Sequence, residues 1–287
     1  MAISLEDIRR RILIALFSDD ELFDTLVLKG GNALALVHKV GSRASVDMDF
    51  SMEQPFSDLE KARVRIFEAL KREFESIGYV VFDEKFEVRP SQRNQDQPEW
   101  WGGYIVEFKL VDRKLYKELG NDIESLRRRA EVVGPQQMRK YTIDISHHEF
   151  CEGKVKREVD DYSVYVYSLE MIAAEKLRAI CQQMPEYEYR VLRTKRPRAR
   201  DFYDIRQIIA EHGIDMTTDK NRSTLAAIFE AKQVPLGLLA EIHKYRDYHA
   251  QDWPSVEASI SGGHDTFDSY FDFVTEVASN LESFWKK

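Results

Sequence analysis

The stretch that decides the fold of this chain runs Arg43-Ala44-Ser45-Val46-Asp47-Met48-Asp49-Phe50. Its apolar and polar side chains alternate, which predicts a strand from Ser45 to Ser51 with one apolar face. Asp47 and Asp49 share the other face, about 7 Å apart along the strand. Because two like charges held side by side repel each other, the pair favours a divalent cation, and Mg²⁺ prefers such hard oxygen ligands.

An isolated pair of this kind is common on the wet face of a strand, so its setting matters. A short apolar strand, Leu26 to Leu28, runs into Gly30-Gly31-Asn32, and a helix is expected to follow through about Val40. The free backbone N–H groups at the start of such a helix form a natural seat for a triphosphate. We expect Asn32 to cap this helix or to donate a hydrogen bond to a phosphate.

A third candidate ligand lies in another alternating segment, Tyr141 to Ser146. Its apolar residues share one face, and Asp144 projects from the other. Three carboxylates on two strands of one sheet could hold two ions about 4 Å apart, as in enzymes of phosphoryl transfer. We therefore predict Asp47, Asp49 and Asp144 as catalytic residues and metal ligands, with Mg²⁺ or Mn²⁺ as the cofactor.

The other segments predict a mixed α+β region followed by helices only. Two capping pairs, Ser4 with Asp7 and Ser57 with Glu60, are typical of helix starts. The remaining elements are a helix over 5–17, a helix ending near residue 78, strands over 79–88 and 104–111, a charged helix over 114–131, and a strand or hairpin over 154–167. Every segment from Ser168 onward has a helical pattern. The sequence thus predicts an α/β core over 1–167 and a helical domain over 168–287.

A lysine stands in the middle of an apolar helix face. In the helix that begins near Ser168, Lys176 falls among the apolar positions at about 100° per residue. On the next helix Asp201 lies inside the apolar arc and Asp204 beyond its edge. A plain account makes Lys176 a snorkelling residue and Asp201 a first-turn carboxylate. Because a buried, unpaired ammonium group is costly, we favour a functional lysine beside a pocket, with Asp201 near it.

Composition bounds the class of protein. The chain has 287 residues, 43% hydrophobic and 32% charged, which is ordinary for a globular protein. Its two cysteines provide neither a disulfide framework nor a zinc cage. No apolar run is long enough to span a bilayer and no signal segment opens the chain, so we expect a cytoplasmic protein without membrane contact.

One basic segment interrupts the net charge of −8. It holds six cations and no acid: Arg190, Arg193, Lys195, Arg196, Arg198 and Arg200. In an acidic protein such a segment indicates a specific site of contact with phosphate groups or, equally, a solvated loop whose charge balances that of acidic neighbours.

Together these residues resemble the AbiEii/AbiGii-type nucleotidyltransferase toxins of toxin–antitoxin and phage-defence systems. Lys29-Gly30-Gly31-Asn32-Ala33-Leu34, followed by the stretch over 43–50, is similar to the family's K-G-G-T-A-L…R-x-S-x-D-[IL]-D-[FL]. Glu175-Lys176-Leu177 and the stretch over 200–205 are similar to its E-K-L and R-[KR]-D-x-x-D-[LI] signatures. One departure is Asn32, which stands where the family usually has a hydroxyl residue.

The resemblance implies a polymerase-β-type nucleotidyltransferase core, a small mixed sheet with helices, followed by a helical C-terminal domain. It implies transfer of a nucleotide from an NTP to an acceptor, RNA such as tRNA in some members, and a cognate antitoxin as partner. Lys29, Arg43 and Ser45 join Gly30, Gly31 and Asn32 as expected nucleotide-binding residues, and the basic segment becomes a candidate RNA contact. The same residues leave two alternatives: an NTP- or RNA-binding module without catalysis, or transfer onto a protein or a small molecule.

Overall fold

The computed structural model describes residues 3–41, 47–92, 97–133, 137–189 and 195–285. Its centre is a seven-stranded sheet in the order β3-β4-β5-β2-β1-β7-β6. The pairs β1–β7 and β2–β5 are parallel, and the other neighbours are antiparallel. The strands are β1 (Val27–Lys29), β2 (Met48–Ser51), β3 (Tyr79–Arg89), β4 (Gly103–Asp112), β5 (Tyr141–Ser146), β6 (Val155–Val159) and β7 (Tyr162–Val166).

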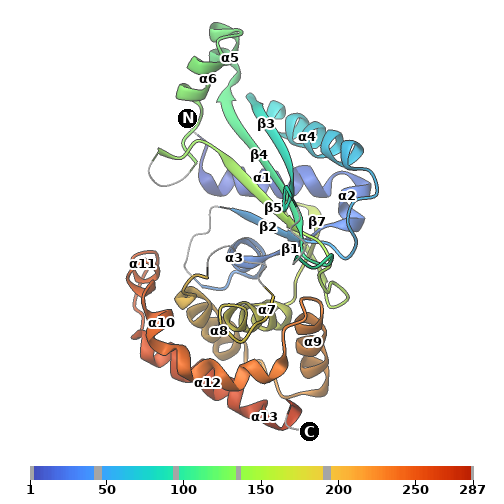
Figure 1. Cartoon of the computed structure of the whole chain (residues 1–287). Helices are drawn as coiled ribbons and strands as arrows, with labels where there is room; N and C mark the ends of the chain where they lie inside the picture. The colour runs from blue at the N-terminus through green and yellow to red at the C-terminus, as the bar shows by residue number, and fades with distance from the viewer. Residues whose placement is uncertain (1–2, 42–46, 93–96, 134–136, 190–194, 286–287) are drawn as a thin grey trace.

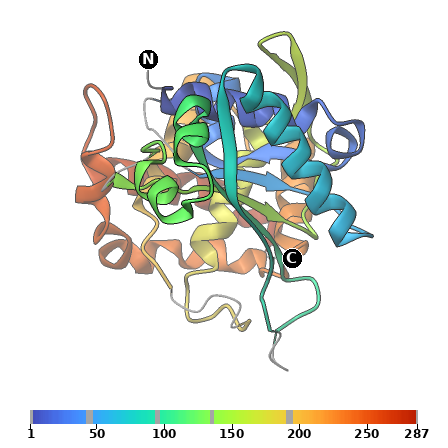
Figure 2. The same cartoon turned by 90° about the horizontal axis from the view of Figure 1, so that it is seen from above.

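The helices of the N-terminal part surround this sheet (Figure 1). The helices α1 and α4 pack on each other and contact β7 and β3, respectively. Seen from above, α4 and the pair α5–α6 flank the long β3–β4 strands (Figure 2). The bounds are α1 (Leu5–Phe17), α2 (Asp20–Thr25), α3 (Gly30–Asn32) with its π-helical continuation η1 (Ala33–His38), α4 (Leu59–Ser76), α5 (Arg113–Leu119) and α6 (Ile123–Arg129).

After β7, all secondary-structure elements of the described residues are helices. They lie together beyond α3, at one end of the sheet (Figure 1). One hydrophobic cluster runs from Ile8 to Leu281 through both parts. The division at residue 168 into two domains stays a prediction. The helical elements are α7 (Leu169–Cys181), α8 (Ala199–His212), α9 (Asp219–Glu230), the 3₁₀-helix η3 (Leu236–Tyr245), α10 (Arg246–Ala250), α11 (Trp253–Glu257), α12 (Phe267–Asn280) and α13 (Glu282–Trp285).

The expected fold class, an α+β core followed by helices, is confirmed. The predicted bounds of α1 and β5 agree with the structure, and Ser4 caps α1 by accepting a hydrogen bond from the Asp7 backbone N–H at 3.0 Å. Strict alternation places the β5 residues Tyr141, Ile143 and Ile145 in the core, with 1% exposure or less.

Three local predictions were wrong. The helix expected over 114–131 is two helices, because Gly120 takes a left-handed φ of +56° and Asp122 caps a new helix. The cap of α4 is Asp58, whose carboxylate accepts from the Lys61 backbone N–H at 3.0 Å, and not Ser57. β2 begins at Met48, and the predicted strand residues Ser45 and Val46 lie outside the described residues. Asp47 therefore lies just outside the strand.

Among the described residues, no helix combines the length and the apolar character that a membrane crossing requires.

A buried histidine makes the stability of the helical part dependent on pH. His249 is fully buried, and its Nδ1 accepts a hydrogen bond from the Arg198 backbone N–H at 3.1 Å. Burial lowers the pKa of His249 to about 4, although Asp201 nearby raises it. In the unfolded chain the pKa of this histidine is about 6.5. Between this pH and about pH 4, the unfolded chain therefore binds a proton at His249 that the folded chain does not bind.

We expect the free energy of unfolding to fall as the pH is lowered from about 6.5 to 4, by up to about 3 kcal/mol from this group. Urea unfolding at several pH values measures the slope, and His249→Asn is the control because asparagine does not titrate. An equally steep slope in His249→Asn would contradict the assignment.

Candidate active site

The predicted carboxylates Asp49 and Asp144 lie side by side at the centre of the sheet. β2 and β5 are parallel neighbours, and their register places Asp49 directly opposite Asp144. Burial raises the pKa of Asp49 to about 7, Lys29 opposes this rise, and Asp144 adds to it. Burial likewise raises the pKa of Asp144. Because desolvation and mutual repulsion disfavour the charged forms of the two carboxyl groups, a bound cation would stabilise both carboxylates.

Asp47 is held differently from its two partners. Its side chain is exposed, while its backbone carbonyl accepts a hydrogen bond from Asn32 Nδ2 at 2.6 Å. The Oδ1 atom of Asn32 accepts from Arg9 Nη1 at 3.1 Å, so this buried amide bridges α1 to the segment before β2. The expected side-chain cap by Asn32 is absent. Asn32 instead fixes the backbone that presents Asp47.

The structure does not show a ready metal site. In the described part of the chain, no three His, Cys, Asp or Glu side chains are grouped closely enough to hold an ion. The donor set nevertheless fits Mg²⁺, which commonly takes one or two protein carboxylates and completes its shell with substrate phosphates. Asp49 and Asp144 supply two half-buried carboxylates of this kind.

A pocket of about 710 Å³ opens above these carboxylates, between the sheet and the helical part. Gly30 and Gly31 line it at the point where β1 turns into α3, as do Lys176 and Asp201 from the helical side. The expected residues Arg43 and Ser45 lie outside the described residues, as do Arg190 and Arg193.

Gly30 is required by the carboxylate beside it. Its φ is +68°, and a Cβ atom there would lie 2.6 Å from Asp49 Oδ2. Any larger residue must therefore adopt an unfavourable backbone conformation and displace the Asp49 carboxylate.

We expect Gly30→Ala to lose both stability, by about 1–2 kcal/mol from backbone strain, and most of the activity of the site. The matched control is Gly213→Ala, since Gly213 has a φ of +59° but nothing within 4 Å of an added Cβ. Thermal melts and activity assays of both variants measure the difference. Equal activity in the two alanine variants would mean that the contact with Asp49 is unimportant.

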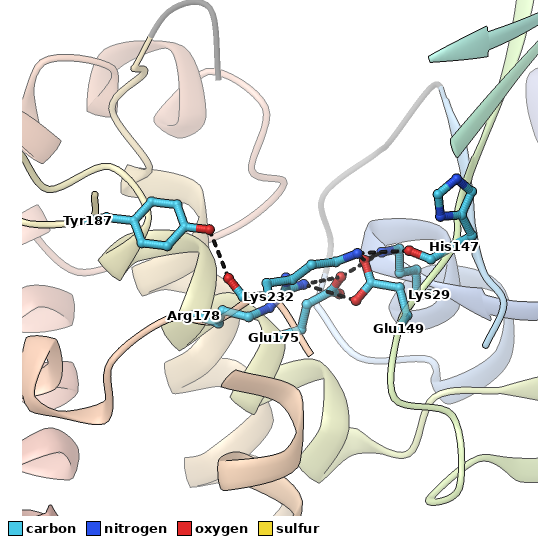
Figure 3. A network of polar contacts seen from close by, with 7 residues as sticks. All are labelled: Lys29, His147, Glu149, Glu175, Arg178, Tyr187 and Lys232. Carbon is cyan, nitrogen blue, oxygen red and sulfur yellow. Dashed lines mark hydrogen bonds and ion pairs between the residues drawn. The ribbon is translucent and has the colours of Figure 1, made fainter. Parts of the chain in front are cut away.

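Lys29 belongs to a buried network of charges (Figure 3). Its Nζ lies 2.8 Å from Glu175 Oε1 and 3.4 Å from Glu149 Oε1. Arg178 and Lys232 also contact Glu149, each at 3.4 Å. The network therefore joins β1, the segment after β5, α7 and the segment after α9. Three cations surround two acids, and these cations hold the pKa of Glu149 down to about 2 although burial opposes the charged form.

Lys176 lies between two buried acids of α8. Its Nζ is 3.0 Å from Asp201 Oδ1 and 2.6 Å from Asp204 Oδ2. Asp201 also accepts from Arg198 Nε at 2.5 Å, and Arg198 and Lys176 hold the pKa of Asp201 below its usual range despite burial. The predicted proximity of Lys176 and Asp201 is confirmed, whereas the placing of Asp204 outside the buried face was wrong.

Part of the basic segment reaches the pocket. Arg198 and Arg200 line it, and the Arg200 side chain is exposed. Lys195 donates to the Met184 carbonyl, and Arg196 is exposed. Only the end of the segment nearest α8 is therefore placed to meet a ligand in the pocket, within the part of the segment that the structure describes.

Sequence reasoning missed several residues of the site: Trp101, Glu149, Glu175, Arg178 and Lys232. Glu175 had a signal, because it precedes Lys176 in a recognised motif. Lys232 had none, since its Nζ is bonded to the His147 carbonyl at 2.8 Å across 85 residues of sequence.

Comparisons with known proteins found a family and similar solved structures. A family model described as "Nucleotidyl transferase AbiEii toxin, Type IV TA system" matches residues 11–273. The chain is similar to JHP933 from Helicobacter pylori, with 16% identity, a TM-score of 0.50, and coverage of 98% of this chain and 91% of that chain. It also matches MenT4, nucleotidyltransferase toxin Rv2826c from Mycobacterium tuberculosis H37Rv, with 15% identity, a TM-score of 0.48, and coverage of 97% and 82%, respectively. No curated protein sequence matches the chain.

Proposed function

We propose that this chain, which belongs to the AbiEii family of nucleotidyltransferase toxins, transfers a nucleotide from an NTP to an RNA acceptor in a reaction that depends on Mg²⁺ or Mn²⁺. The observation that carries the proposal is the register of β2 and β5, which sets Asp49 beside Asp144 in the pocket. Family membership accounts for the nucleotidyltransferase activity and implies an antitoxin partner. The metal, the acceptor and the roles of single residues are our assignments.

We assign the seat of the triphosphate to the turn from β1 into α3. Gly30 and Gly31 line the pocket there, and neither carries a side chain that would keep a phosphate from the backbone N–H groups of the turn. Asp49 and Asp144 would hold the cation, and we assign Asp47 as a further ligand although its exposed side chain is not among the residues that line the pocket. The bound cation would offset the charge that develops on the phosphate. We assign contacts with phosphate oxygens to Lys176 and Arg200, which line the helical wall of the pocket.

In the reaction, a hydroxyl oxygen of the acceptor attacks the α-phosphorus of the NTP. A new P–O bond forms, the bond between the α-phosphorus and the bridging oxygen breaks, and pyrophosphate leaves. We assign the hydroxyl proton of the acceptor to Asp144, whose carboxylate lies beside Asp49 in the pocket. Lys29, held by Glu175 and Glu149, provides positive charge beneath the carboxylates.

RNA is the favoured acceptor because of the charges at the pocket. Arg198 and Arg200 line its helical wall, and both belong to the basic segment, for which the sequence left a phosphate contact and a solvated loop as equal alternatives. A polyanion fits this wall better than a neutral small molecule does.

The test is incubation of the purified protein with each labelled NTP, total RNA and Mg²⁺ or Mn²⁺. We expect label in RNA that disappears with EDTA, and sequencing of the labelled species identifies the acceptor. Label in a protein or a small molecule would show that the acceptor is not RNA. Transfer that persists in EDTA would refute the proposed dependence on a divalent metal ion. NTP binding without transfer to any acceptor would identify a binding module.

A further inference from the structure

The pocket extends across five neighbouring strands, well beyond the carboxylates. Neighbouring strands are about 4.8 Å apart, so the pocket is roughly 19 Å long across the sheet. In spatial order from β1 to β3, its lining includes Gly30, Asp49, Asp144, Gly103 and Arg89. The carboxylates lie near the middle of this row, and the assigned triphosphate seat lies at one end.

Trp101 lines the far side of the pocket, just before β4. Gly103 pairs with Ser146, which is two residues, about 7 Å, along β5 from Asp144. β4, and the residues that precede it, lie one strand spacing away from β5. Trp101, two residues before Gly103, therefore lies beyond the carboxylates on the side of β5 that is away from β1 and the triphosphate seat.

The position of Trp101 is fixed by the residues around it. A Cβ atom on Gly103 would lie 2.2 Å from the Ile145 carbonyl oxygen, so this glycine brings the segment close to β5. The indole is half-buried against the main core, and Lys232 Nζ lies 5.9 Å from its ring centre. Lys232 is itself held by the His147 carbonyl and Glu149 (Figure 3). These contacts restrict the orientation of the Trp101 indole.

We propose that the base of the NTP stacks on Trp101, an inference that rests on the proposed nucleotidyl transfer. The order of groups across the pocket matches the order within a nucleoside triphosphate: phosphates over β1, the α-phosphate at β2 and β5, and the base beside β4. The arginines Arg198 and Arg200 lie on the other wall and suit the backbone of the acceptor. Because every base has a π-face, Trp101 contributes affinity for the nucleotide without selecting its base.

The neighbouring tryptophan provides a matched control. Trp100 contacts the edge of Tyr189, with ring centres 5.2 Å apart, and is not among the residues that line the pocket. Loss of Trp100 removes a similar ring from the same segment without removing the proposed platform.

The experiment compares Trp101→Leu, Trp101→Phe and Trp100→Leu in steady-state transfer assays, with thermal melts to confirm folding. Since a base–aromatic stack is worth about 1–3 kcal/mol, we expect Trp101→Leu to raise the KM for the NTP roughly 5- to 160-fold. Trp101→Phe should restore most of the affinity and Trp100→Leu should resemble the wild type. Inhibition by inorganic tripolyphosphate should be the same in all variants, because the triphosphate seat is unchanged.

An unchanged KM for the NTP in Trp101→Leu would overturn the inference, and a raised KM for RNA alone would assign the ring to the acceptor instead. If the wild type transferred no nucleotide at all, the proposed function would fail. Equilibrium binding of a labelled NTP to the wild type and to Trp101→Leu would still decide whether the base stacks.

Discussion

Asp49→Asn and Asp144→Asn are each expected to reduce nucleotide transfer at least 10²- to 10³-fold, about the effect of removing one group that stabilises a charged transition state. Both side chains face the pocket from paired positions of β2 and β5. Asparagine keeps the shape and removes the charge, so the loss would report on electrostatics and not on packing. Initial rates with saturating NTP and RNA measure the effect.

The same substitutions should not destabilise the protein. Burial raises the pKa of Asp49 to about 7, above the ordinary aspartate value of about 3.9. The folded state therefore binds a proton more tightly than the unfolded state, and stability falls as the pH rises from about 4 to 7. At pH 8 we expect Asp49→Asn to melt at or above the wild-type temperature. Asp24→Asn, at an exposed position, is the control; full activity in Asp49→Asn would end the catalytic assignment.

Lys176→Met is expected to lose transfer and also stability. Its ammonium group is the partner of two buried acids, Asp201 and Asp204, so methionine leaves buried negative charge uncompensated. Breaking such a pair costs about 3–5 kcal/mol. Urea unfolding and transfer assays measure the two losses separately.

A second substitution separates stability from function. Asp201 keeps Arg198 as a partner, so we expect the double variant Lys176→Met/Asp204→Leu to recover much of the lost stability. It should remain inactive if Lys176 contacts the phosphates. A stable and active double variant would show that Lys176 only ties α7 to α8.

Local patterns in the sequence predicted those parts of the fold that depend on local physics. The alternation over 141–146 gave the bounds of β5 because each of its apolar residues enters the core. It also predicted that Asp144 and Asp49 would occupy one sheet, and their pairing followed from the topology. The break at Gly120 was missed because the charged pattern continues across it, although the backbone conformation there does not.

The parts of the site that could not be predicted depend on contacts between distant segments. Glu149 and Lys29 are 120 residues apart, and Lys232 reaches the segment after β5 from the far side of α9. A buried charge is tolerated only when its partners are present, and no periodicity of a single segment specifies them. For the same reason the helical wheel of α8 put Asp204 outside the buried face. The wheel considers one helix only, whereas Lys176, the partner of Asp204, lies on α7.

The buried charge network has a consequence for synthesis of the protein in the cell. Its members are spread along the chain from Lys29 to Lys232, and the wall of the pocket is complete only when the last of them has joined. A nascent polypeptide that is still on the ribosome before residue 232 carries all three aspartates without Lys232. Products that end before residue 232 would therefore lack one cation of the network around Glu149 and part of the wall of the pocket.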